Sequence, residues 1–189
     1  SPYARLDALA ERTPAGAQGL IFLPCLMGAM TPTWNEAARG TFCGFTLAHT
    51  REHFARAILE GSAYAVRDLT DRLAALGLAP RELRAVGGGA RSRLWNQIKA
   101  DVTGLPVAVP QTPETTALGA GMLALIGTGA YPTLTAASAA VVHIVDRFEP
   151  RPAQQAVYAQ TYALYRAAYA ALLPTFDQTA RFQASELAG

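Results

Sequence analysis

The stretch VGGGARSRLWNQ, residues 86–97, places three consecutive glycines between two segments of different periodicity. Val86 ends a short segment in which apolar and polar residues alternate, as in a strand. After the glycines, apolar residues recur every four positions, at Leu94, Ile98 and Val102. The pattern therefore predicts a strand, a tight turn and a helix. Glycines without Cβ atoms either serve the turn alone or let a ligand approach the backbone closely.

The segments around this turn predict alternating strands and helices. We expect a strand over 82–87, a helix over 91–103, a strand over 106–110 and a helix from Thr112-Pro113-Glu114 to Ile126. The last of these helices is apolar almost all round, which predicts that it is buried. This order predicts an α/β layer with parallel strands and right-handed crossovers.

The flanking segments predict further elements. Upstream, we expect the tail of a helix over 2–13, a buried strand within 19–27, a loop over 28–40, a strand over 41–45 and a long helix from the N-cap Thr50 to Gly77. The expected apolar stripe of the long helix is Phe54, Ile58, Val66, Leu69, Leu73 and Leu76. Downstream, we expect helices over 134–141 and 151–177, followed by a frayed tail over 178–189. Pro174 is expected to kink or end the final helix, whose expected apolar stripe is Tyr158, Tyr162, Tyr165, Tyr169, Leu172 and Phe176.

Composition excludes several classes of protein. The chain has 189 residues and a formal net charge of +2, so it has no strong electrostatic case for nucleic acid or acidic membranes. Its longest apolar stretch is about half the ~20 residues of a membrane span. Cys25 and Cys43 cannot form a disulfide framework, which predicts an intracellular, cytoplasmic protein.

Common ligand motifs also fail. The dinucleotide fingerprint lacks its third glycine, because Ser92 stands in that place, and no acid ends the strand at Val109. No phosphate loop with a Gly-Lys-Ser/Thr ending is present. His49 and His53 share a helix face but lack a third ligand, so we expect no metal site.

The segment LRAVGGGARSRLWNQIKADVTGLPVAVPQTPETTALGAGMLALIGTGAY resembles the adenosine-binding segment of FGGY carbohydrate kinases, most of all xylulokinases. The matching pattern is GGGA-x-S, W-x-Q, AD-x-x-G-x-P-V and E-x-x-ALGA. The segments GLIFLPCLMGAMTPTWNEAARGTFCGF and HTREHFARAILEGSAYAVRD also resemble that family. The best-matching core covers residues 14–131.

The resemblance implies an α/β fold of the actin-like (ribonuclease H-like) ATPase class, incomplete here, with long helices on a small mixed sheet. It implies that residues 1–189 are part of the C-terminal nucleotide-binding domain of a kinase that transfers the γ-phosphoryl group of MgATP to a small sugar. D-xylulose is the expected sugar; glycerol, gluconate and ribulose are alternatives. A non-catalytic binding or assembly module with the same fold is a further alternative.

The resemblance also implies roles for individual residues. The expected adenosine-binding residues are Gly87, Gly88, Gly89, Ala90, Ser92 and Asn96. Ser92 is equally a candidate helix cap, and Asn96 is equally a candidate for the solvated face. Trp95 is expected to pack rather than to stack on a ligand. No residue of this chain is expected to be catalytic.

Other matched residues are expected to be structural. We expect Glu114 to bond backbone amides near its helix start, and Gly119 and Gly121 to permit close helix packing. Arg56 and Glu60 are spaced for an ion pair that supports the fold.

One departure concerns the loop where xylulokinases usually read G-E-R-T-P. This chain has Ala29 and Met30 in place of the glutamate and arginine. The sugar site, the aspartate base and the Mg²⁺ site are expected to lie outside this fragment. We therefore expect the fragment alone to be inactive, to bind ATP or ADP weakly, and to expose cleft surface that favours an artificial homodimer.

Overall fold

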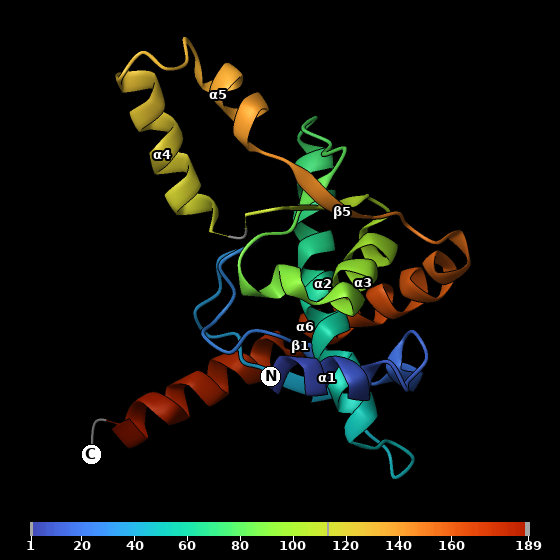
Figure 1. Ribbon diagram of the computed structural model, residues 1–189. Helices are drawn as coiled ribbons and strands as arrows, with labels where there is room; N and C mark the ends of the chain where they lie inside the picture. The colour runs from blue at the N-terminus through green and yellow to red at the C-terminus, as the bar shows by residue number, and fades with distance from the viewer. Residues whose placement is uncertain (1, 113, 188–189) are drawn as a thin grey trace.

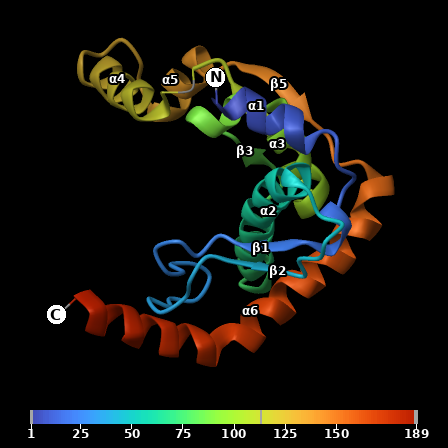
Figure 2. The same ribbon diagram turned by 90° about the horizontal axis from the view of Figure 1, so that it is seen from below.

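Helix α2 is the central element of the computed structural model, which describes residues 2–112 and 114–187 (Figure 1). The helices are α1 (Pro2–Ala10), α2 (Arg51–Ala75), α3 (Arg93–Thr103), α4 (Thr115–Gly127), α5 (Leu134–Val141) and α6 (Pro152–Leu187), with short 3₁₀ turns η1 (Ala17–Gly19) and η2 (Gly88–Arg91). The strands are β1 (Ile21–Leu23), β2 (Thr41–Cys43), β3 (Leu83–Arg84), β4 (Val107–Pro110) and β5 (Ile144–Phe148). Figure 2 shows α6 curving around the side of α2 and the strands β1 and β2.

The strands form two small sheets. Strands β1 and β2 pair antiparallel, with Phe22 opposite Phe42. Strands β3 and β4 pair parallel, as the order strand–helix–strand predicts, and β5 adds to β4 antiparallel. The sequence did not predict β5, because its residues IVDRF do not alternate between apolar and polar. The result is a small mixed sheet beside long helices.

Helix α2 begins and ends where expected. The Thr50 N–H donates to Nδ1 of His53 at 3.1 Å, and Gly77 adopts a φ of +79° just after the last turn. The expected apolar stripe is confirmed only in part. Phe54 and Ile58 pack against a core cluster, but Leu69 and Leu76 are exposed. The fully buried face carries Ala55, Ala57, Leu59, Ala63 and Tyr64 instead. Small residues lie on the buried face because α1 and α3 both pack closely against this helix.

A buried ionic network joins α2 to α6. Arg56 Nε donates to Glu60 Oε1 at 2.7 Å, which confirms the expected ion pair. The same carboxylate oxygen accepts hydrogen bonds from the Gly16 N–H at 3.0 Å and the Tyr158 hydroxyl at 3.1 Å. Arg56 also donates to the Tyr158 hydroxyl at 2.6 Å. One buried carboxylate oxygen thus bonds three groups, two of which, at Gly16 and Tyr158, are distant in sequence.

The aromatic stripe of α6 fills the largest core cluster. The helix buries Tyr158, Tyr162, Tyr165 and Phe176 against α2 and β1, as the spacing predicts. We expected the last dozen residues to be frayed, but α6 continues to Leu187 with Pro174 inside it; residues 188–189 lie outside the described residues. Proline removes one N–H but does not stop a helix whose next turn still packs, and here Phe176 is 2 % exposed.

Helix α4 differs from the expectation in its burial. It has no buried residue, and it projects from the body beside α5 (Figure 1). A Cβ on Gly119 or Gly121 would meet nothing within 4 Å, so these glycines do not serve close packing among the described residues. Glu114 is at the N-cap but makes no side-chain cap bond. Pro113, expected at the first helical position, lies outside the described residues.

Candidate functional site

The glycine turn connects β3 to α3 as the sequence predicts. Gly87 has a φ of +70°, which an L side chain rarely adopts, and Gly88 begins the 3₁₀ turn η2. Ser92 then caps α3, because its Oγ accepts a hydrogen bond from the Trp95 N–H at 3.0 Å. The capping interpretation of Ser92 is therefore confirmed.

Asn96 of α3 fixes the turn through a hydrogen bond to its backbone. It is completely buried, so the interpretation that placed it on the solvated face is wrong. Its Nδ2 donates to the Ala90 carbonyl at 2.7 Å, and its Oδ1 accepts from Lys99 Nζ at 3.1 Å. Ala90 is buried as well. These two residues fix the path of the turn.

A cavity of about 540 Å³ lies between this turn and the helices α1 and α2. Its lining residues are Ala4, Leu6 and Asp7 of α1, Ile58, Leu59 and Ser62 of α2, and Gly88, Gly89, Arg91, Ser92 and Trp95. Three of the six predicted site residues, Gly88, Gly89 and Ser92, thus line one cavity. Gly87, Ala90 and Asn96 do not line it and instead shape the turn. The α1 and α2 walls had no signal in the sequence beyond ordinary helix patterns.

Trp95 explains why the turn needs a glycine at position 89. A Cβ on Gly89 would lie 2.6 Å from Cζ3 of the Trp95 ring, which is closer than atoms can approach. The ring is held in place because Nε1 donates to the Leu59 carbonyl at 3.1 Å. Trp95 therefore packs, as expected, but it also forms one wall of the cavity.

Lys99 covers the other side of the tryptophan. Its Nζ lies 4.2 Å from the centre of the Trp95 ring, a cation–π contact. Burial lowers the pKa of Lys99 to about 8. The tryptophan is thus clamped between α2 and the α3 lysine, so it presents a fixed face.

The cavity fits a purine nucleoside in size and in chemistry. Its volume lies within the roughly 300–1,000 Å³ typical of small-ligand sites. Glycine backbone and a fixed aromatic ring suit a flat heterocycle, and Ile58 and Leu59 add apolar wall. The charged residues in the lining are Asp7 and Arg91.

The histidine pair is part of the fold. Nδ1 of His49 accepts from the Thr46 N–H at 3.0 Å, and Nδ1 of His53 is the acceptor of the α2 cap. Among residues 2–112 and 114–187, no group of three or more His, Cys, Asp or Glu side chains is placed to hold a metal ion. In the same ranges, no helix is long and apolar enough to cross a bilayer. Cys25 and Cys43 are both free thiols.

Comparison with known proteins identifies a family to which the chain is similar. The model of the FGGY family of carbohydrate kinases, C-terminal domain, matches residues 1–128. Xylulose kinase of Staphylococcus epidermidis is 34 % identical over 161 residues, which are 85 % of this chain and 32 % of that protein. Gluconokinase of Bacillus licheniformis is 35 % identical over 185 residues, 97 % of this chain and 36 % of that protein. Glycerol kinases also match.

Solved structures show the same likeness. The crystal structure of xylulose kinase from Rhodospirillum rubrum aligns with a TM-score of 0.81 at 41 % identity, covering 93 % of this chain and 35 % of that one. This confirms the expected α/β fold of the actin-like ATPase class. The chain spans about a third of the length of the relatives it matches. It belongs to the FGGY family of carbohydrate kinases, and residues 1–128 match that family's C-terminal domain.

Proposed function

We propose that this chain supplies the adenosine-binding part of an ATP-dependent carbohydrate kinase. The observation that carries the proposal is the cavity beside Gly88 and Gly89, whose volume and aromatic wall suit a purine nucleoside. In this proposal Gly88 and Gly89 let the ligand contact the backbone, and Trp95 forms the wall on which it rests. Asn96 and Ala90 hold the turn in position. None of these residues takes part in the chemical step.

Bound ATP supplies the γ-phosphoryl group that such kinases transfer to a sugar hydroxyl, and Mg²⁺ offsets the phosphate charge. No cluster of metal-ligating side chains occurs among the residues the structure describes. We therefore propose that the Mg²⁺ ligands, the sugar site and the general base belong to other parts of the parent protein. On this basis the chain binds and orients the nucleoside, which contributes by positioning.

A side chain at position 88 tests the nucleoside site. A Cβ on Gly88 meets no atom within 4 Å, so Gly88→Val is expected to fold normally while its side chain narrows the cavity. Calorimetry with ADP should give at best roughly millimolar binding, about −4 kcal/mol, for the unsubstituted chain. Gly88→Val should weaken this at least about tenfold, or ~1.4 kcal/mol.

Gly119→Ala is the matched control, because it also adds a Cβ in open space but lies on α4, away from the cavity. It should leave ADP binding unchanged. Equal affinity in the Gly88→Val chain and the unsubstituted chain would place the nucleoside elsewhere.

The substrate is proposed to be D-xylulose, which is phosphorylated by the full-length parent to xylulose 5-phosphate. The support is the likeness to xylulose kinases; the gluconokinase and glycerol kinase matches make gluconate and glycerol the competing substrates. A coupled assay of the parent protein with xylulose, ribulose, gluconate and glycerol distinguishes them. A cytoplasmic location stays a prediction of the same proposal.

The chain of 189 residues is expected to lack turnover by itself. With ATP and D-xylulose it should form no sugar phosphate, because the proposal assigns the base to another part of the parent. A product signal that rises with the concentration of this chain would contradict that assignment. The parent protein, assayed under the same conditions, is the positive control.

A further inference from the structure

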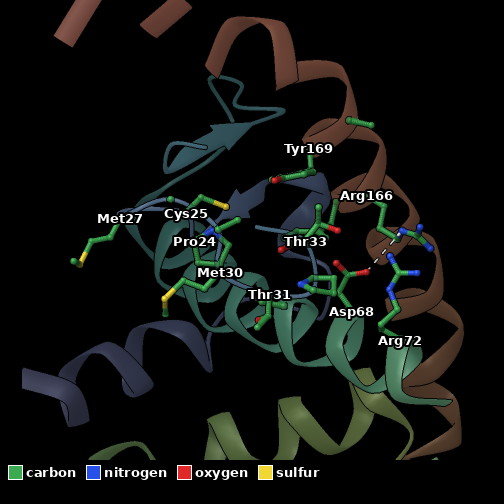
Figure 3. Close-up of a pocket in the computed structure, with 16 residues that line it drawn as sticks. Pro24, Cys25, Met27, Met30, Thr31, Thr33, Asp68, Arg72, Arg166 and Tyr169 are labelled. Carbon is green, nitrogen blue, oxygen red and sulfur yellow. Dashed lines mark ion pairs between the residues drawn. The ribbon is translucent and has the colours of Figure 1, made fainter. Parts of the chain in front are cut away.

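A second cavity of about 470 Å³ lies between the loop 24–33, α2 and α6 (Figure 3). It shares no lining residue with the cavity at the glycine turn. Helix α2 contributes Ala65, Asp68 and Arg72 here, one to three turns further along than its wall at the first cavity. The site is therefore independent of the proposed nucleoside site.

The charged wall of this cavity is centred on Asp68. Its Oδ1 accepts a hydrogen bond from the Tyr162 hydroxyl at 3.1 Å and lies 4.0 Å from Nε of Arg166. The Tyr162 ring is covered by the Arg67 guanidinium at 4.4 Å. The hydrogen bond from Tyr162 fixes the Asp68 carboxylate, which lies within ion-pair distance of Arg166.

Arg72 adds a second cation to the same wall. It follows Asp68 by four residues, so both side chains project from one face of α2. Figure 3 shows its guanidinium beside that of Arg166. Within the part of the chain that the structure describes, no carboxylate pairs with Arg72, since Asp71 pairs with Arg67 instead. Two guanidinium groups therefore face one carboxylate, leaving the wall with a net positive charge.

The rest of the lining is largely apolar. It includes Pro24 and Met30 from the loop, and Tyr165 and Tyr169 from α6. Met30 is 72 % exposed, and methionine side chains adjust readily to ligands of different shape. A cavity with an exposed thioether and an excess of cationic groups is suited to a ligand with one acidic end and a less polar body.

Ala29 and Met30, at which the chain departs from the G-E-R-T-P pattern, both line this cavity. Because they stand in place of a glutamate and an arginine, the loop side of the cavity carries no charged side chain among the described residues. Asp68, Arg72 and Arg166 are then the charged residues of the lining.

We propose that this cavity binds a small organic anion. The acidic head group, a phosphate or a carboxylate, bonds to Arg72 and Arg166, because guanidinium groups bind such oxygens through paired N–H donors. The body of the ligand packs against Met30 and Tyr169. Asp68 holds Arg166 in place and rejects a second acidic group.

The methionines provide a direct test. The chain has three, and Met27 and Met30 line this cavity whereas Met122 lies on α4. With ¹³C-labelled methionine methyl groups, titration with phenyl phosphate should shift the Met27 and Met30 signals to saturation and leave Met122 unchanged. Phenol, which has the same body without the charge, should produce no saturable shift. Because neither reporter lines the glycine-turn cavity, this result is independent of the proposed nucleotide binding.

Arginine variants assign the head group. Arg72→Ala and Arg166→Ala should each weaken phenyl phosphate binding about fivefold, since both residues are exposed to water. Arg81→Ala, which removes an exposed arginine outside the cavity, should leave it unchanged. Unshifted Met27 and Met30 signals, equal binding of phenol, or full affinity in both cavity variants would each overturn the proposal.

Discussion

Glu60→Ala is expected to lower the free energy of unfolding by about 3–5 kcal/mol, a large part of the roughly 5–15 kcal/mol available to a domain of this size. The substitution leaves the Arg56 guanidinium, whose side chain is 7 % exposed, without its carboxylate partner. It also leaves the Gly16 N–H without an acceptor. Both groups stay buried, so water cannot replace the lost interactions at low cost. Urea unfolding followed by circular dichroism measures the change.

An exposed ion pair on the same helix is the matched control. Arg67 Nε and Asp71 Oδ2 are 3.8 Å apart with the same i, i+4 spacing, and the Asp71 side chain is 52 % exposed. Asp71→Ala should cost less than about 1 kcal/mol. The triple variant Arg56→Met, Glu60→Leu, Tyr158→Phe removes the charges together and should recover much of the loss. A Glu60→Ala chain as stable as Asp71→Ala would show that the buried network contributes nothing.

Alkaline pH is expected to destabilise the chain strongly. Burial raises the pKa of Tyr64, Tyr158 and Tyr165 well above that of a tyrosine in water. Above pH ~10, the ordinary tyrosine pKa, the unfolded chain releases these phenol protons while the folded chain retains them. Because the folded state then binds more protons, the free energy of unfolding falls as pH rises. Between pH ~10 and ~11 each tyrosine lowers the free energy of unfolding by about 1 kcal/mol, so the three together lower it by roughly 3 kcal/mol.

Urea unfolding at a series of pH values measures this slope. Lys99 acts in the opposite direction, since its pKa is lowered to about 8, but its effect is nearly complete at the ordinary lysine value of ~10.4. Tyr64→Phe loses one titrating group and its bond to Thr161, so it should start less stable but fall less steeply with pH. A stability that stays flat to pH ~11 would mean that the folded phenols ionise at their ordinary pKa.

Local signals in the sequence predicted most of the elements. The caps and glycines placed α2 and α3 within one or two residues, because Thr50, Ser92 and Gly104 act through their own backbone and immediate neighbours. The six-residue stripe of α6 succeeded because its aromatic residues meet one continuous partner surface. The parallel pairing of β3 and β4 followed from the crossover rule.

The errors concern burial, which depends on partners distant in sequence. The apolar residues of α4 predicted a buried helix, yet among the described elements only the adjacent α5 packs extensively on it. On α2 the large residues Leu69 and Leu76 predicted the wrong face, since the alanines face the neighbouring helices. The terminal residues of α6 had no local helix signal strong enough to outweigh Pro174.

Three of the six residues predicted for the site line the cavity, and the other three shape the turn beside it. The glycine turn was predicted from three adjacent glycines between a strand and a helix, whereas its role as a ligand site was predicted from the family resemblance. The walls from α1 and α2 were not, since Leu6 and Ile58 resemble any core residue until the helices are packed. The sequence also could not predict that Gly88 lines the cavity whereas Asn96 is buried and supports the turn, because this depends on the three-dimensional arrangement.

The exposed apolar surface of α4 governs how concentrated solutions of this chain behave. Leu123 is 63 % exposed on a helix with hardly any charge to repel a neighbouring molecule. Excluded salts such as ammonium sulfate strengthen contacts between such surfaces. This chain should therefore precipitate, and scatter light, at a lower salt concentration than expected from its nearly equal numbers of acidic and basic residues. Aspartate or glutamate substitutions along α4 are the direct way to improve its solubility.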